Sequence, residues 1–188
     1  MERVLVIGAS CAGKTTFASS LAKRLQCPHV ELDALYWGPN WTERDSFQEE
    51  VERASQKDRW VIEGGYSMVQ ELLWTRGTDL IWLDFPFFLV FLRAIKRTWR
   101  RSVSKEILYN GNQENFFRAF FTPDGIPWWV IRSYARKKKH WAVSIQRPEY
   151  AHLRIHRFHR PEFAEAFLRS CGSSSTSVSP EKEFDSTA

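Results

Sequence analysis

The pattern of apolar and polar residues divides the chain into short apolar runs that alternate with longer amphipathic stretches. The first and fourth runs are almost continuously apolar, which is typical of parallel strands covered on both faces. Alternation of strands with helices predicts an α/β fold, a doubly wound parallel sheet of five strands. The expected strands cover residues 3–8, 29–33, 59–64, 79–85 and 152–158.

Apolar periodicity and end signals predict the helices. The apolar residues from Phe17 to Leu25 recur at the i, i+4, i+8 spacing of one helix face. Ser46 and Glu49 have the spacing of a capping box, and Pro86 suits the first turn of a helix. The expected helices cover residues 17–25, 46–57, 87–101 and 161–168.

The segment between the first strand and the first helix has the pattern of a phosphate-binding loop. Gly8 to Thr15 fits G-x-x-x-x-G-K-[ST], the P-loop of nucleotide-binding proteins. Its glycines let the backbone N–H groups point at a phosphate, and the following helix adds the positive end of its dipole. We expect Lys14 to reach the β- and γ-phosphates and the Thr15 hydroxyl to ligate Mg²⁺. The predicted ATP-binding residues are Gly8, Ala9, Ser10, Cys11, Ala12, Gly13, Lys14, Thr15 and Thr16.

Acidic residues stand at the ends of the next three predicted strands. These are Asp33, Glu63 and Asp84. Ligands of open α/β sheets bind at the carboxyl ends of the strands, so these acids are expected to face the crevice beside the P-loop. One acid would then bind or deprotonate an acceptor hydroxyl, and another would orient Mg²⁺ water. The alternative is that each acid only caps the following helix or turn.

The residues that follow Asp33 and Glu63 favour the functional interpretation for these two acids. Aromatic residues that suit a substrate pocket follow Asp33, and two glycines that allow a ligand to approach the backbone follow Glu63. Asp84 favours neither interpretation. The predicted metal residues are Thr15 and Glu63, and the predicted acceptor residues are Asp33, Tyr36, Trp37, Gly64, Gly65 and Tyr66.

Composition indicates one globular domain, which we place at residues 1–171, followed by a Ser-rich tail at 172–188 that is expected to be disordered. The formal charge of +5 favours an anionic partner without identifying it. The three cysteines form no C-x-x-C pair, so we expect neither a disulfide framework nor a zinc site, and a cytoplasmic location. Three histidines, His152, His156 and His159, lack an acidic or cysteine neighbour in the sequence, and no metal is assigned to them.

Two possible targeting signals are also rejected from the sequence. The first predicted strand begins almost at the first residue, so no cleavable signal peptide is expected. Residues 80–95 are apolar enough to suggest a membrane span, but Asp84 and Pro86 interrupt them. A buried strand followed by a helix explains this run better, so no membrane partner is expected. The oligomeric state is not readable from the sequence.

Several segments together resemble one bacterial family. The segments GASCAGKTT, LDALYWGPNW, WVIEGGYS, TDLIWLDFP and RAIKRTWRR resemble the P-loop proteins known as DNA topology modulation proteins. These are adenylate-kinase-like and related to shikimate and gluconate kinases. The resemblance implies that Asp33 is the acid used on the acceptor. Glu63 replaces the aspartate, and Gly65 the asparagine, of the more usual D-G-N-Y segment.

The same resemblance implies a lid. Residues 93–139 are rich in Arg, Lys and aromatic residues and contain no clear strand, so they are expected to form a basic helical insertion. In related kinases the lid begins here, and its arginines stabilise charge on the transferring phosphoryl group. Arg97 and Arg101 are one turn apart on one helix face and are the predicted lid residues, although a solvated cationic face explains them almost as well.

The segment SYARKKKHW also has two interpretations. Basic residues interleaved with tryptophans can bind nucleic acid by charge and stacking. They also fit a helix whose tryptophans face the core while its lysines face water, which is the favoured interpretation. Nucleic acid is therefore a possible partner that is not favoured.

A P-loop without the N-K-x-D motif of GTPases or the L-S-G-G-Q signature of ABC proteins favours a small phosphotransferase. We therefore expect an ATP- and Mg²⁺-dependent kinase that acts on a small hydroxylated or nucleotide acceptor. Lys14, Asp33, Arg97 and Arg101 are its predicted catalytic residues. The alternative is a nucleotide-binding regulator with weak NTPase activity that acts on DNA or RNA.

Overall fold

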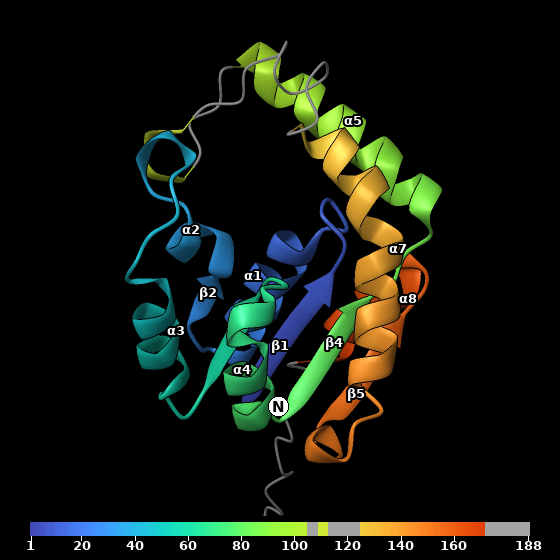
Figure 1. Cartoon of the computed structure of the whole chain (residues 1–188). Coiled ribbons are helices and arrows are strands. Elements are labelled where there is room, and N and C mark those ends of the chain that lie inside the picture. Colours follow the sequence, from blue (N-terminus) through green and yellow to red (C-terminus); the bar gives the residue numbers. More distant parts are fainter. Residues whose placement is uncertain (105–108, 113–124, 172–188) are drawn as a thin grey trace, which may run out of the picture.

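The computed structural model describes residues 1–104, 109–112 and 125–171. Its centre is a five-stranded parallel sheet in the order β2-β3-β1-β4-β5 (Figure 1). The prediction of a doubly wound, five-stranded parallel sheet is therefore confirmed. The strands are β1 (Arg3–Gly8), β2 (His29–Glu31), β3 (Trp60–Glu63), β4 (Asp79–Leu83) and β5 (Arg154–Phe158).

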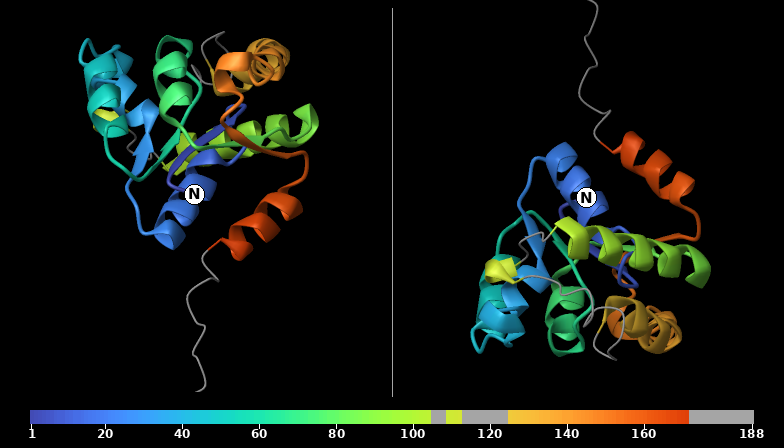
Figure 2. Two further views of the ribbon diagram at one scale, coloured as in Figure 1. Left: turned by 90° about the horizontal axis from the view of Figure 1, so that it is seen from below. Right: turned by 90° about the horizontal axis from the view of Figure 1, so that it is seen from above.

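Helices cover both faces of the sheet. Helices α1 and α8 pack on one face, and α3 and α4 pack on the other (Figure 2). Helices α5 and α7 lie against each other, and α5 lies beyond the carboxyl ends of β1 and β4 (Figure 1). The carboxyl half of α7 runs along the sheet face that α3 and α4 also cover, where Trp141 is buried (Figure 2). The α-helices are α1 (Lys14–Leu25), α2 (Leu32–Tyr36), α3 (Phe47–Ser55), α4 (Gln70–Arg76), α5 (Phe87–Ser104), α7 (Ile126–Ser144) and α8 (Pro161–Ser170). Short 3₁₀ helices are η1 (Pro39–Trp41), η2 (Ser67–Val69), η3 (Tyr109–Gly111) and η4 (Pro148–Tyr150).

The central strand β1 shows why its sequence is continuously apolar. Val4 and Val6 point into the core beneath α1 and α8, while Leu5 and Ile7 point into the core beneath α3 and α4. All four are at most 3% exposed. Each such side chain contributes roughly 1.5–3 kcal/mol of hydrophobic stabilisation. Burial on both faces positions the loop after β1 at the centre of the carboxyl edge.

Several predicted boundaries need correction. Strand β2 ends at Glu31, so Asp33 lies in the first turn of α2 and not in a strand. The expected capping box is absent, because the Ser46 hydroxyl donates its hydrogen bond to the Glu50 carboxylate over 2.8 Å and caps no backbone group. Helices α2 and α4 were not predicted, because they are too short to show the apolar periodicity of a longer helix.

The apolar run considered as a membrane span divides as expected into β4 and the start of α5. Within the described ranges, no helix is long and apolar enough to cross a membrane. The predicted tail at 172–188 and residues 105–108 and 113–124 of the predicted lid lie outside the described residues.

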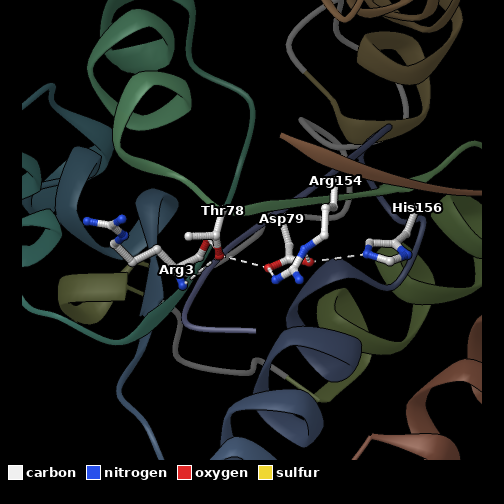
Figure 3. Close-up of polar contacts among 5 residues, drawn as sticks. All are labelled: Arg3, Thr78, Asp79, Arg154 and His156. Carbon is white, nitrogen blue, oxygen red and sulfur yellow. Dashed lines mark hydrogen bonds and ion pairs between the residues drawn. The ribbon is translucent and has the colours of Figure 1, made fainter. Parts of the chain in front are cut away.

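A polar network ties three strands together at the amino ends of the sheet, opposite the P-loop (Figure 3). Asp79 is completely buried and binds both the Nε and Nη2 of Arg154 at 2.9 Å. The Thr78 hydroxyl donates to Asp79 at 2.7 Å, and the Arg3 backbone N–H donates to Thr78 at 3.2 Å. Burial acts to raise the pKa of Asp79, but hydrogen bonds from Arg154, Thr78 and His156 outweigh it and hold that pKa below its ordinary value.

Candidate active site

The phosphate loop connects β1 to α1. Gly13 has a φ of 95°, a left-handed conformation that favours glycine, and α1 begins at the next residue, Lys14. A Cβ at Gly8 would lie 2.9 Å from the carbonyl oxygen of Leu83, so β4 leaves no room for a side chain there. The Lys14 ammonium group donates a hydrogen bond to the Ala9 carbonyl oxygen over 3.2 Å. The lysine therefore lies over the loop, beside the positive end of α1.

Thr15 and Glu63 connect α1 to the end of β3. The Thr15 hydroxyl donates a hydrogen bond to Glu63 Oε1 over 2.6 Å, and Glu63 is only 3% exposed. Burial raises the pKa of Glu63, against the opposing effects of the Lys14 charge and the hydrogen bond from Thr15. The hydroxyl and the carboxylate are oxygen ligands of the kind that Mg²⁺ prefers. The two residues predicted to hold metal therefore lie together.

Two residues of β2 extend this group. In the described part of the chain, His29, Glu31 and Glu63 place one ligand atom each within 4.8 Å of the others. Glu31 pairs in register with Glu63, which explains their proximity. Glu31 was not predicted as a site residue, although its place in the strand just before Asp33 was an available signal.

Asp33 and Tyr66 form the other half of the site. The Tyr66 hydroxyl donates a hydrogen bond to Asp33 Oδ1 over 2.6 Å. Burial and the negative charge of Asp33 raise the pKa of Tyr66 well above its ordinary value, so the hydroxyl remains a donor. The Tyr36 ring packs on Trp37, Phe47 and Tyr66 with centroid distances of 4.8, 5.1 and 4.6 Å. The predicted acceptor residues Asp33, Tyr36, Trp37 and Tyr66 therefore belong to one cluster.

The two glycines between Glu63 and Tyr66 are required by packing within the protein. Gly64 has a φ of 142°, and a Cβ there would lie 2.8 Å from the Leu32 side chain. A Cβ at Gly65 would lie 2.8 Å from the Trp141 ring. Close approach of a ligand to these glycines stays a prediction.

The arginines of α5 approach the phosphate loop. Arg93 Nη1 donates to the Ala12 carbonyl oxygen at 3.0 Å, and Arg97 Nη1 lies 3.8 Å from Cys11 Sγ. The predicted lid residue Arg97 is therefore next to the loop. Arg93, which was not among the predicted lid residues, contacts the loop directly. The role of Arg101 stays a prediction.

The short segment around η3 reaches the acceptor half of the site. The Tyr109 hydroxyl donates to Glu31 Oε2 at 2.9 Å. The buried Asn112 side chain donates to the Gly38 carbonyl oxygen at 2.8 Å and accepts from the Trp41 N–H at 3.0 Å. This segment lies against η1 and α2, whereas α5 lies on the other side of the molecule in Figure 1. The insertion therefore spans both halves of the site.

The three consecutive lysines of α7 have different environments. Lys138 pairs with the buried Asp84 at 2.9 Å, Lys137 lies over two tryptophan rings, and Lys139 is exposed. The favoured interpretation of this helix, core tryptophans with solvated lysines, is wrong in part, since Trp128 is 47% exposed. The lysines also do not form the continuous solvated patch that nucleic-acid binding would use.

Asp84, whose role the sequence left open, is a buried carboxylate that several more exposed basic side chains surround. Besides Lys138, it pairs with Arg157 at 2.6 Å and with His159 at 3.2 Å. His156 similarly lies 3.3 Å from Asp79. The expectation that acidic partners are lacking is therefore wrong for His156 and His159, because parallel pairing of β4 with β5 brings distant residues together. His152 instead lies 3.2 Å from the Trp74 carbonyl oxygen.

No protein-family model and no curated protein matches this sequence. Solved structures do match. The shikimate kinase of Bacteroides thetaiotaomicron is similar at 16% identity and a TM-score of 0.53, over 89% of this chain and 94% of that one. The Acinetobacter baumannii shikimate kinase in complex with shikimate gives 13% identity and a TM-score of 0.52, over 90% and 92% of the two chains. A gluconokinase of Sinorhizobium meliloti is similar at 12% identity and a TM-score of 0.50, over 89% of this chain and 87% of the gluconokinase.

These likenesses define the class of fold. The protein has the P-loop kinase fold of the shikimate and gluconate kinases, as the sequence resemblance implied in its broader part. The narrower resemblance to the DNA topology modulation proteins stays a prediction, since no comparison bears it out.

Proposed function

We propose that this protein is a kinase that transfers the γ-phosphoryl group of ATP to a small acceptor in the presence of Mg²⁺. The observation that carries the proposal is the convergence of both halves of the site on Glu63. Its pKa responds to the charges of Lys14 and Asp33 and to the hydrogen bond from Thr15. This closeness of the predicted phosphate residues and the predicted acceptor acid to one carboxylate supports the proposal, because direct transfer requires the donor and acceptor to lie together.

The phosphate loop and its neighbours form the donor side. The loop N–H groups and Lys14 would hold the β- and γ-phosphates. The Thr15 hydroxyl and the Glu63 carboxylate, which already contact each other, would hold Mg²⁺ directly or through water. The metal ion, when bound, neutralises phosphate charge that develops during transfer.

Asp33 forms the acceptor side. Its carboxylate would accept a hydrogen bond from the acceptor hydroxyl and take its proton as the oxygen attacks the γ-phosphorus. The hydrogen bond from Tyr66 fixes the orientation of this carboxylate. Tyr36 and Trp37 would form the wall beside it.

The basic insertion would complete the site. Arg97 is close enough to the loop to stabilise charge on the transferring group, and Arg101 follows it one turn later on α5. Closure of this helical insertion over the crevice would exclude water and so favour transfer over hydrolysis.

The experiment that tests this function measures ADP release from Mg-ATP across a panel of acceptors. The panel contains nucleosides, nucleoside monophosphates, polyols, sugar acids and shikimate. Shikimate is included because one of the similar structures is a kinase in complex with it. We expect release to depend on the acceptor in the wild type and to be lost in Lys14→Ala. Release that no acceptor changes would contradict a kinase and favour the weak NTPase or nucleic-acid regulator.

Asp33→Asn separates the acceptor role from nucleotide binding. The variant should transfer far more slowly while it binds Mg-ATP with nearly wild-type affinity, because Asn cannot take the hydroxyl proton. An equal loss of binding and transfer would contradict an acceptor-side role for Asp33.

A further inference from the structure

Lys137 occupies an unusual position for a lysine in a basic helix. Its ammonium group lies 5.5 Å from the ring centre of Trp129 and 6.0 Å from that of Trp141. Both distances are within the range of a cation–π interaction. The two rings hold the end of this side chain in place, whereas the side chain of Lys139 on the same helix is exposed.

Lys137 has no anionic partner in the described part of the chain. No carboxylate among those residues lies within ion-pair distance of its ammonium group, while Lys138 is 2.9 Å from Asp84. Burial and the positive charge of Lys14 lower the pKa of Lys137 to about 8, although the charge of Asp33 acts in the opposite direction. Even a partly buried cation close to another cation is costly unless an anion compensates it.

The surroundings of Lys137 connect it to the acceptor half of the site. The Trp141 ring beneath it packs against Gly65, which directly precedes Tyr66. Tyr66 in turn holds Asp33 by its hydrogen bond. Lys14 is the lysine of the phosphate loop, and the charges of Lys14 and Asp33 both act on Lys137, so Lys137 supplies a second positive charge near these two groups.

We propose that Lys137 binds an anionic group of the acceptor, a carboxylate or a phosphate, and thereby selects negatively charged acceptors. This inference rests on the proposed kinase function and narrows its acceptor class. Nucleoside monophosphates and sugar acids fit it, whereas neutral nucleosides and polyols do not. If the γ-phosphate of ATP supplied this anion instead, Lys137→Met would change ATP KM and not the preference among acceptors.

Matched pairs of acceptors test the proposal. Gluconate with sorbitol, AMP with adenosine, and shikimate with its methyl ester each compare an anionic compound with a neutral one. Acceptor kcat/KM and ATP KM are measured for the wild type, Lys137→Met and Lys139→Met. A second readout, the change in tryptophan fluorescence on titration with each compound beside a non-hydrolysable ATP analogue, needs no turnover.

We expect the wild type to prefer the anionic member of at least one pair by roughly tenfold to a hundredfold, the value of one charge-assisted contact. Lys137→Met should remove this preference and leave ATP KM unchanged, and Lys139→Met should behave as wild type. Circular dichroism spectra of both variants serve as the control for correct folding.

Three results would overturn the inference: an unchanged preference in Lys137→Met, a loss that falls on ATP KM, or no binding of any anionic compound. Its failure is distinct from failure of the kinase proposal. Anion binding that depends on Lys137, without phosphorylation of any compound, would support the anion site while it contradicts the kinase.

Discussion

The hydroxyl of Thr15 donates a 2.6 Å hydrogen bond to the buried carboxylate of Glu63, and this contact joins the phosphate loop to the neighbouring strand. Glu63 comes from β3, which lies beside β1 in the sheet. The side chains of Thr15 and Glu63 meet because the loop after β1 and the end of β3 both lie at the carboxyl edge of the parallel sheet. The predicted metal residues are therefore positioned by strand order, before any ligand binds.

Glu63→Gln should separate stability from function. The raised pKa of Glu63 means that the folded protein holds this proton more tightly than the unfolded chain does. Stability is therefore lost as the pH rises from the unfolded value toward the folded pKa, and the loss persists above it. The variant should show an apo Tm at neutral pH equal to or above that of the wild type.

The same substitution should lower Mg-ATP-dependent turnover by about tenfold to a hundredfold, as for other residues that support a metal site. Thermal denaturation from pH 4 to 8 and initial rates measure the two effects, with the exposed Glu49→Gln as control. A lower Tm with unchanged Mg²⁺ dependence would show that Glu63 only supports the fold.

Arg97→Ala should slow transfer and have little effect on binding of Mg-ATP. An arginine that stabilises the transferring phosphoryl group contributes about a thousandfold or more to kcat. Lys96→Ala, which removes an exposed charge from the same helix, is the matched control. Single-turnover rates and calorimetric ATP affinity distinguish the two roles. An unaltered kcat would place Arg97 outside the transfer step.

Asp79→Asn should destabilise the protein by roughly 1.5–3 kcal/mol, because the buried Asp79 carboxylate loses the charge that strengthens its hydrogen bonds to the exposed Arg154 and to Thr78. The low pKa of Asp79 stabilises the fold above the unfolded value near 4 and loses this effect as the pH falls through the folded pKa. The variant should therefore lose less stability than the wild type on acidification.

Urea unfolding at pH 7 and at low pH measures both effects of Asp79→Asn. Glu149→Gln removes the exposed pair with Arg147 and should change stability very little. Equal free energies of unfolding for the wild type and Asp79→Asn would mean that the network of Figure 3 contributes nothing to the fold.

The pH dependence of catalysis should reveal Lys137. With a carboxylate-bearing acceptor, kcat/KM should fall as the pH rises through about 8, where Lys137 loses its proton in the free enzyme. Lys14, Asp33 and Arg136 are the charged groups that act on it. A neutral acceptor, or Lys137→Met, should lack this decrease. The same alkaline decrease in Lys137→Met would assign it to another group.

The sequence was sufficient for the parts of the molecule that depend on local patterns. The apolar run of β1 and the glycines that follow it predicted the central strand and the loop before α1, because burial on both faces and left-handed backbone favour particular residue types. The acid at Glu63 was predicted in the same way, as a polar residue that ends a buried strand.

Other features depend on distant residues and left no local signal. Lys137, Lys138 and Lys139 are consecutive and chemically identical, and only the packing of α7 decides which contacts Trp141, which pairs with Asp84 and which is exposed. The histidine partners likewise arise from pairing between β4 and β5.

The most direct measurement of the central claim follows the phosphoryl group itself. Wild-type protein and Lys14→Ala are incubated with Mg-ATP and the best acceptor of the panel, and mass spectrometry quantifies ADP and phosphorylated acceptor. The account predicts that the wild type forms the two in equal amounts and that Lys14→Ala forms neither. ADP with free phosphate and no phosphorylated acceptor, or transfer that persists in Lys14→Ala, would contradict it.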